Sequence, residues 1–272
     1  MSTWTFERPA TMHGVTARRV SVAAVDRPAD GVIRVSLGGP ELAGFVSTGP
    51  SDHVKVFVPD PVTGVLSAPS TAPDGSLVRP AGPTISRDYT PIVPQPAGDA
   101  SILDLDFMDH PDPGPATAWA LRARPGDEIV IAGPRGSRGA PLAMAGLLAA
   151  VDATALPSLA RWLGALPAGA PATVVVALER DEDWLRGYLG SPLDGADVQV
   201  VGTGADDLAT AVRARGRVAD GVFVTTAGEA TAVAAVRRML AREQGLPPAQ
   251  VAASGYWRRG VTAFDHHTPL DD

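Results

Sequence analysis

The chain has 272 residues, of which 45% are hydrophobic and 19% charged, so it is long enough for two globular domains. Its formal net charge of −7 argues against nucleic acid as the main partner, because binding phosphates requires a basic surface. The absence of cysteine excludes disulfides, thiolate zinc sites, iron–sulfur clusters and cysteine nucleophiles.

The N-terminal residues lack the basic start and apolar run of a signal peptide. The longest apolar stretch, residues 140–156, is interrupted by Pro141, Gly146 and Asp152, and is too short to span a bilayer. We therefore expect a cytoplasmic protein with no membrane insertion.

Six short runs rich in β-branched residues occupy the first half of the chain, and turn signals such as Gly-Pro and Pro-Gly-Asp separate them. Several runs alternate apolar and polar residues, as in an antiparallel sheet with one face in water. Their number and spacing predict a small barrel or sandwich. The runs are residues 15–25, 31–38, 53–59, 84–92, 101–107 and 127–133.

Two segments interrupt these strands. Residues 115–124 have a helical pattern, with Pro115 suited to the first turn and Pro125-Gly126 as the stop. Residues 59–83 are rich in proline, glycine, serine and alanine and have no periodicity. This stretch is either a surface insertion or a loop over a site, and the first interpretation is favoured.

The second half alternates strand and helix patterns, which is typical of a doubly wound parallel sheet. Strands are expected at residues 147–151, 172–179, 197–202, 221–226 and 251–257, with helices between them. The best supported helix is 228–245, where Val233, Val236 and Leu240 share one face and Glu229 lies at the positive end. We place the domain boundary near residues 139–146.

The segment TISRDYTPI, residues 84–92, raises the question of what its side chains contact. In a strand, Arg87 and Tyr89 share one face, which is no ordinary apolar core face. A guanidinium can fork onto a phosphate, a phenol can stack on an isoalloxazine ring, and the Thr90 hydroxyl can hydrogen-bond flavin N5. Taken alone, an edge strand with an exposed arginine explains the tetrapeptide better.

Three further segments could bind a cofactor. A Gly-Pro turn at 114–117 opens a helix and exposes backbone N–H groups to phosphate, although an ordinary capped helix explains it equally well; His110 nearby is a ligand contact or a surface residue. Residues 152–157 follow the first strand of the second half, where open α/β sheets bind ligands. Residues 254–260, SGYWRRG, are either an aromatic shield for a flavin or a final strand packed at an interface.

Motifs for other chemistry are missing. The chain contains no G-x-G-x-x-G, G-x-S-x-G, H-E-x-x-H or Walker A sequence. The adjacent His266 and His267 lie in a polar tail, and we expect no metal site. Chemistry carried by a redox cofactor is therefore favoured.

Together these segments resemble the siderophore-interacting protein family, flavin-dependent ferric-siderophore reductases of the ferredoxin-reductase superfamily. The similarity covers nearly the whole chain and includes RDYT, GPATAWALRARPGDEIVIAGPRGS, DATALPSLARWL, AGEATAVAAVRRML and SGYWRRG. It implies a six-stranded antiparallel FAD-binding barrel at residues 1–142 and an NAD(P)H-binding type of α/β domain at 143–272. The residue after Arg87 is often a small hydroxyl residue in this family and is Asp88 here.

The resemblance also assigns site residues. Arg87 would bind the FAD pyrophosphate, while Tyr89 would pack on the flavin and Thr90 would lie near its N5, so these last two are the expected catalytic positions. Phosphate would be cradled by Gly114, Pro115, Ala116 and Thr117. Apart from the resemblance, His110 just before this turn is taken as a further cofactor contact. The nicotinamide nucleotide would face Asp152, Thr154, Ala155, Leu156, Pro157, Gly228, Glu229, Tyr256 and Trp257.

The implied function is reduction of ferric siderophores in the cytoplasm by a monomer. Electrons would pass from NADPH or NADH, or from reduced ferredoxin, through FAD to the iron. Two alternatives stay open: an FAD-dependent oxidoreductase with another acceptor, and a siderophore-binding module without enzymatic activity.

Overall fold

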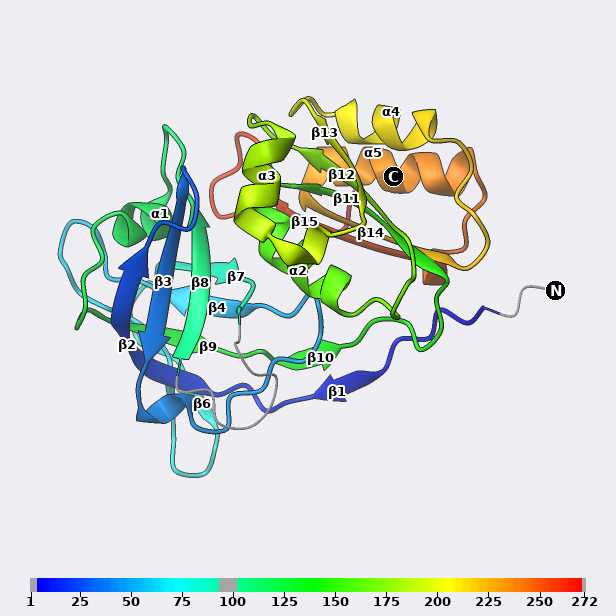
Figure 1. Ribbon diagram of the computed structural model, residues 1–272. Coiled ribbons are helices and arrows are strands. Elements are labelled where there is room, and N and C mark those ends of the chain that lie inside the picture. The colour runs from blue at the N-terminus through cyan, green and yellow to red at the C-terminus, as the bar shows by residue number, and fades with distance from the viewer. Residues whose placement is uncertain (1–3, 93–101, 271–272) are drawn as a thin grey trace. The chain divides into compact units, whose positions relative to one another are not determined.

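The computed structural model describes residues 4–92 and 102–270, and the chain forms two units (Figure 1). One unit is Ala10–Gly139, and the other is Ala140–Asp272 together with the N-terminal segment up to Pro9. None of the helices in the described ranges combines the length and the apolar character that a membrane crossing needs.

The first unit is built on a six-stranded antiparallel sheet in the order β7-β4-β9-β2-β3-β8. Its strands are β2 (Ala17–Asp26), β3 (Val32–Gly38), β4 (Val54–Phe57), β7 (Ser86–Tyr89), β8 (Ile102–Met108) and β9 (Glu128–Ala132). The outer strands close on each other where Ile92 and Asp104 exchange two backbone hydrogen bonds of 2.9 and 3.0 Å. The predicted six-stranded antiparallel barrel is confirmed, and only Ser101 of the predicted strands lies outside the described residues.

The barrel core follows from strand alternation. On β8, which pairs with β3, the side chains of Leu103, Leu105 and Phe107 are fully buried. The residues between them lie on the opposite face of the sheet, where the buried Asp106 accepts two hydrogen bonds of 2.7 Å from Arg34 on β3. A fork of this kind fixes the register of two neighbouring strands as well as joining them.

Smaller elements complete this unit: β1 (Ala10–Met12), η1 (Pro40–Leu42), β5 (Ser70–Thr71), β6 (Leu77–Val78), α1 (Pro115–Ala120) and β10 (Gly136–Arg138). The stretch 59–83 contains the β5–β6 hairpin, which the sequence did not predict because each strand has only two residues. The Thr71 hydroxyl exchanges hydrogen bonds with the backbone of Ala17, and Leu66 and Ala68 pack on an outer patch of the sheet. The stretch is therefore a surface insertion held against the barrel.

The second unit is a five-stranded parallel sheet in the order β13-β12-β11-β14-β15 (Figure 1). Its strands are β11 (Gly146–Asp152), β12 (Ala172–Ala177), β13 (Asp197–Val201), β14 (Val222–Glu229) and β15 (Val251–Trp257). Its helices are η2 (Ala153–Ala155), α2 (Leu156–Gly164), α3 (Glu182–Leu189), η3 (Ser191–Leu193), α4 (Asp207–Ala214), α5 (Ala230–Arg242) and η4 (Pro248–Gln250). The predicted doubly wound domain is confirmed.

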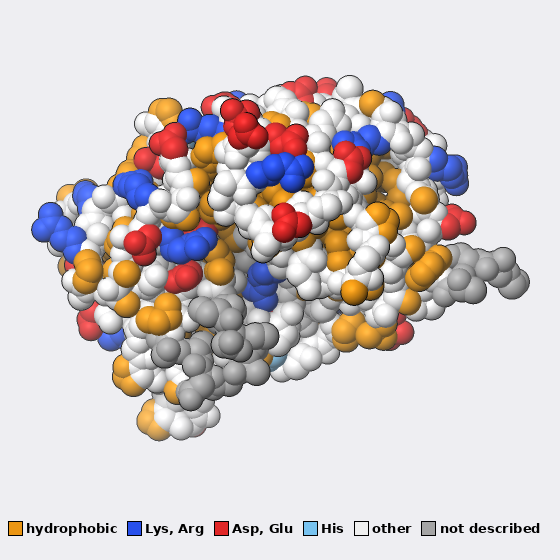
Figure 2. Space-filling model, viewed as in Figure 1, with side chains coloured by type: hydrophobic (Ala, Val, Ile, Leu, Met, Phe, Trp, Pro, Cys, Tyr) orange, Lys and Arg blue, Asp and Glu red, His pale blue; other side chains and the backbone are white. Residues whose placement is uncertain are grey.

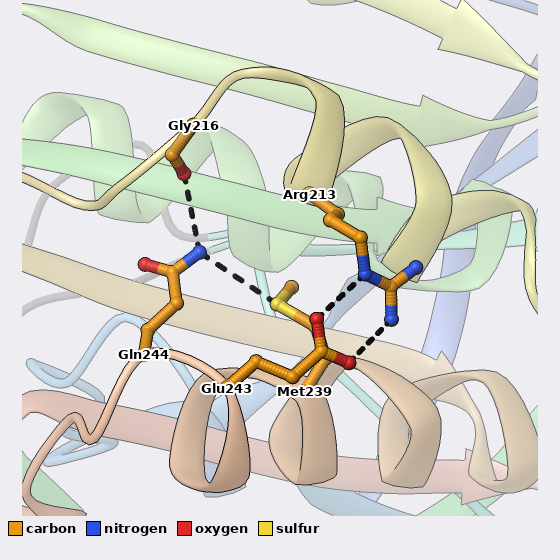
Figure 3. A network of polar contacts seen from close by, with 5 residues as sticks. All are labelled: Arg213, Gly216, Met239, Glu243 and Gln244. Carbon is orange, nitrogen blue, oxygen red and sulfur yellow. Dashed lines mark hydrogen bonds and ion pairs between the residues drawn. The ribbon is translucent and has the colours of Figure 1, made fainter.

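Two hydrophobic layers cover this sheet. One contains the buried residues of α2 and α3, and the other contains those of α4 and α5. Helices α4 and α5 are joined on the surface, where Arg213 donates two hydrogen bonds of 2.7 Å to Glu243 and Gln244 donates to the Gly216 carbonyl (Figure 3). The order of the strands reverses between β11 and β14, which is where open sheets of this type bind ligands.

Two helices differ in length from the sequence prediction. Helix α1 ends at Ala120 instead of Arg124, because the amides of Arg122 and Ala123 bond three residues back in turns. Helix α5 runs from Ala230 to Arg242, and Val233, Val236 and Leu240 are fully buried as predicted.

The N-terminal segment packs on the α/β unit. The Phe6 ring lies 5.9 Å from the ring of Phe223, and the Arg8 guanidinium lies 5.0 Å from the ring centre of Trp162. Trp4 fills the space beside Gly221, since a side chain at that glycine would collide with its indole. These contacts bury aromatic surface that the sheet alone leaves uncovered.

Candidate functional site

Strand β7 presents Arg87 and Tyr89 on one face, as predicted. Its register pairs Tyr89 with Val54 and Arg87 with Val56 of β4, and both valines belong to the barrel core. Asp88 lies on the opposite face, where the ammonium group of Lys55 donates to its carboxylate at 2.8 Å. The face of Arg87 and Tyr89 is therefore continuous with the apolar interior.

Tyr89 joins three elements of the barrel unit. Its ring centre lies 4.3 Å from that of Phe107 on β8, and Phe107 lies 6.0 Å from Trp119 on α1. Thr117 at the start of α1 lies near the Tyr89 hydroxyl and acts to lower its pKa, against the larger effect of burial. Burial raises the pKa of Tyr89 to about 12, so the phenol stays neutral at physiological pH. Two segments expected to contact FAD thus lie side by side.

The start of α1 offers unused backbone donors. No side chain caps this helix at Gly114, and Pro115 occupies its first position. A Cβ added at Gly114 would have no neighbour within 4 Å, so the space beside this turn is open. Ala116 and Thr117 follow in the first turn and are buried. Uncapped amides with open space in front of them suit a phosphate group.

Arg87 supplies a cation in the same unit. Its Nη1 donates 2.7 Å to the carbonyl of its neighbour Ser86, and its side chain is half-buried. This guanidinium, the uncapped turn at Gly114 and the half-buried ring of Tyr89 match the charge and shape of a flavin dinucleotide. These residues therefore fit FAD.

Thr90 and His110 are the other predicted site residues of the barrel unit. Thr90 follows the end of β7 and is buried. His110 is exposed after the end of β8, and none of its described contacts is with Arg87 or Tyr89. Its role as a cofactor contact stays a prediction.

In the α/β unit, the predicted residues gather at the carboxyl ends of β11, β14 and β15. Asp152 ends β11, and its carboxylate accepts hydrogen bonds from the Thr154 amide and hydroxyl, the Glu229 amide and the Trp257 indole. Burial raises the pKa of this carboxyl, and the four donors oppose that rise. Ala155, Leu156 and Pro157 continue into α2 and are buried.

Gly228 and Glu229 end β14 instead of starting the helix after it. Glu229 is the N-cap of α5, and its side chain accepts a hydrogen bond from the Ala232 amide. Gly228 has a φ of +135°, and a Cβ there would collide with the Asp152 carboxylate. The glycine is thus required both by its backbone and by the buried aspartate beside it.

The C-terminal aromatic pair divides into two roles. Tyr256 is half-buried against the core layer that contains α2 and α3, whereas Trp257 is 36% exposed and donates its indole N–H to Asp152. Arg259 was not predicted as a site residue: its amide donates to Glu229 and its guanidinium to the Thr203 carbonyl after β13. The signal in the sequence that could have found it was its place in the segment SGYWRRG, two positions after Trp257.

Charge is uneven on this unit. Figure 2 shows acidic side chains gathered over α3, whose first turn carries Glu182 and Asp183.

Near the C-terminus, Asp265, His266 and His267 bring ligand-type atoms within 4.8 Å of one another. All three belong to one turn, and such groupings are common on protein surfaces without a bound ion.

The architecture and the barrel residues define a class: an FAD-binding barrel followed by a nucleotide-binding type of α/β domain, as in ferredoxin reductases. A ferredoxin reductase of carbazole 1,9a-dioxygenase shares this fold, with a TM-score of 0.64 at 15% identity over 88% of this chain and 66% of that one. Residues 21–138 match the siderophore-interacting FAD-binding domain, and residues 144–260 match the siderophore-interacting protein domain. The chain belongs to the siderophore-interacting protein family.

Individual relatives agree with this assignment. The NADPH-dependent ferric-chelate reductase of Escherichia coli is 35% identical over 242 residues, which are 88% of this chain and 92% of that protein. The ferric vibriobactin reductase ViuB of Vibrio cholerae is 28% identical over 247 residues, 87% of each chain. A siderophore utilization protein from T. fusca superposes with a TM-score of 0.82 at 34% identity, covering 96% of this chain and all of its own.

Proposed function

We propose that this chain is a flavin-dependent ferric-siderophore reductase. FAD in the barrel unit would carry electrons from NADPH to siderophore-bound ferric iron and so release ferrous iron for assimilation. The reductases of E. coli and V. cholerae named above support this activity, because both act on ferric chelates by name. The proposal includes the expected cytoplasmic location and monomeric state.

The observation that carries the proposal is the position of Tyr89. Its ring lies 4.3 Å from that of Phe107, which in turn lies 6.0 Å from Trp119, so β7, β8 and α1 meet beside one half-buried aromatic ring. Residues 87–90 and 114–117 were expected to contact FAD on separate grounds, and they are 24 or more positions apart. A shared location is what a single dinucleotide ligand requires.

Each residue of the barrel site would then bind or orient. Arg87 and the amides after Gly114 would hold the pyrophosphate, the Tyr89 ring would support the flavin, and Thr90 would lie near N5. FAD, when bound, supplies the step from a two-electron hydride donor to one-electron acceptors. Hard oxygen ligands bind ferrous iron far more weakly than ferric iron, so reduction is sufficient for release.

The donor is the finer part of the proposal. A five-stranded parallel sheet with this order is a nucleotide-binding architecture, which favours NADPH or NADH over reduced ferredoxin. The Arg259 guanidinium, held at the Thr203 carbonyl, supplies a cation for the 2′-phosphate of NADPH. The acidic first turn of α3 opposes this preference, so both nucleotides belong in the test.

Replacing Arg87 tests the FAD site. The Arg87→Ala protein should fold normally but lose FAD on gel filtration, with its FAD dissociation constant raised about tenfold or more, since a charge-assisted phosphate contact is lost. Arg27→Ala removes an exposed arginine of the same unit and serves as the control. Equal FAD affinity in the two variants would mean that Arg87 is a surface residue only.

Anaerobic mixing tests the donor. NADPH should bleach the flavin absorbance of the wild-type holoprotein within seconds, and NADH should do so more slowly. If neither nucleotide bleaches the flavin but reduced ferredoxin does, the pyridine-nucleotide part of the proposal is wrong and the FAD part stands.

A further inference from the structure

Asp152 has an unusual set of partners for a buried carboxylate. It is 8% exposed, and its described hydrogen bonds all come from donor groups of the protein. One oxygen accepts from the Thr154 amide at 2.9 Å and the Thr154 hydroxyl at 2.6 Å. The other accepts from the Glu229 amide and the Trp257 indole, both at 2.8 Å. Three of the four donors are N–H groups, which cannot accept a hydrogen bond, so the oxygen facing Glu229 and Trp257 has to act as an acceptor, whereas the Thr154 hydroxyl can donate or accept.

These contacts use up the groups that would otherwise bind a ligand's phosphate. The Thr154 amide belongs to the turn that leads into α2, and the Glu229 amide precedes α5. Both lie where the strand order reverses, the usual position for a dinucleotide phosphate. The side chain of Asp152 occupies this position with its two oxygens, and Gly228 leaves room for it. Asp152 is thus enclosed and unsuited to touch a ligand directly.

The fourth donor, the Trp257 indole, connects Asp152 to the surface. Trp257 ends the edge strand β15, and its ring reaches across the end of β14 to Asp152 on β11. With the N–H end fixed, 36% of the residue still faces solvent. An aromatic plate held by one hydrogen bond loses little conformational entropy when a flat ring stacks on it.

We propose that Asp152 is a positioning residue whose carboxylate fixes the Trp257 indole as a plate for the planar ring of a pyridine nucleotide. The inference rests on the nucleotide-donor part of the proposed function. It assigns different roles to two residues of one predicted site: Trp257 contacts the ligand, and Asp152 acts through Trp257.

Nucleotide binding in paired variants tests this assignment. Trp257→Phe keeps an aromatic ring but removes the N–H, and Asp152→Asn removes the charge from the other side of the same bond. Each should raise the NADP⁺ dissociation constant about threefold to tenfold, the size expected for one misplaced aromatic contact. The double variant should be no weaker than the weaker single variant, because both break one unit. Calorimetry on the FAD-loaded protein gives these constants.

Trp184→Phe is the control, since Trp184 stacks on Tyr188 within α3 and lies in the same unit. It should leave NADP⁺ affinity within about twofold of wild type. Acrylamide quenching of tryptophan fluorescence should increase in Asp152→Asn, because the Trp257 indole loses its hydrogen-bond partner and becomes more mobile. The increase should be much smaller in the double variant Asp152→Asn/Trp257→Phe, which lacks this indole.

Several results would overturn the inference. Additive losses of NADP⁺ affinity in the double variant, or an unchanged affinity in Trp257→Phe, would show that Asp152 only stabilises the fold. If Asp152→Asn does not fold, Trp257→Phe and the Trp184→Phe control still decide the question. Wild-type protein that retains FAD but binds no NADP⁺ or NAD⁺ would remove the donor proposal as well, which separates the two failures.

Discussion

Replacing Gly228 by alanine should destabilise the α/β unit by about 3–5 kcal/mol. A side chain at φ +135° costs about 1–3 kcal/mol by itself, because L-residues rarely adopt this conformation. The new Cβ would also lie 2.6 Å from Oδ1 of Asp152, so the carboxylate has to move. Each weakened hydrogen bond to this charge adds about 1.5–3 kcal/mol at most.

Urea denaturation followed by far-UV circular dichroism measures this loss, because helices α2 to α5 all belong to the α/β unit. Gly187→Ala is the matched control: Gly187 lies inside α3 with open space around its Cα, so alanine should stabilise by about 0.5–1 kcal/mol. A Gly228→Ala protein as stable as wild type would refute the close fit between Gly228 and Asp152.

Three further outcomes are expected. Spectroscopic titration of the apoprotein should show one tyrosine that ionises near pH 12, and this transition should be absent in Tyr89→Phe. The stability of the wild-type protein should fall between about pH 10 and pH 12, because the folded state keeps the phenol proton to a higher pH than the unfolded chain. A normal titration of all three tyrosines would contradict this prediction. Phe6→Ala should lower the stability of the α/β unit by about 2 kcal/mol in thermal or urea unfolding, since Phe223 loses its cover; an unchanged unfolding midpoint would mean that the N-terminal segment is dispensable. Arg259→Ala should raise KM for NADPH about tenfold and KM for NADH much less; equal effects would place Arg259 away from the 2′-phosphate.

Much of the fold could be predicted because the local patterns agree with it. Alternation such as that of Leu103, Leu105 and Phe107 marks a half-buried strand without any knowledge of its partners. The two-residue strands β5 and β6, and the pair β1 and β10, are too short for any periodicity to appear. Helix α1 stops at Ala120 although its pattern continues, because turns take over the backbone hydrogen bonds.

The site was less accessible to sequence reasoning. The shared face of Arg87 and Tyr89 follows from strand geometry, and the register with β4 confirms it. The contact of Tyr89 with Phe107, and the bond between Asp152 and Trp257 across 105 positions, depend on tertiary packing that no local pattern encodes. Glycine at 228 gave a hint, but its reason appears only beside the buried carboxylate.

The central claim is that this protein reduces siderophore-bound ferric iron through FAD. The direct measurement is anaerobic: FAD-loaded protein, NADPH, a ferric siderophore and a chromogenic ferrous trap. We expect about two ferrous ions for each NADPH consumed, because one hydride carries two electrons and each ferric ion accepts one. The Arg87→Ala protein, measured without added FAD, should release iron far more slowly. No ferrous iron above the protein-free control with NADPH, NADH or reduced ferredoxin would contradict the account.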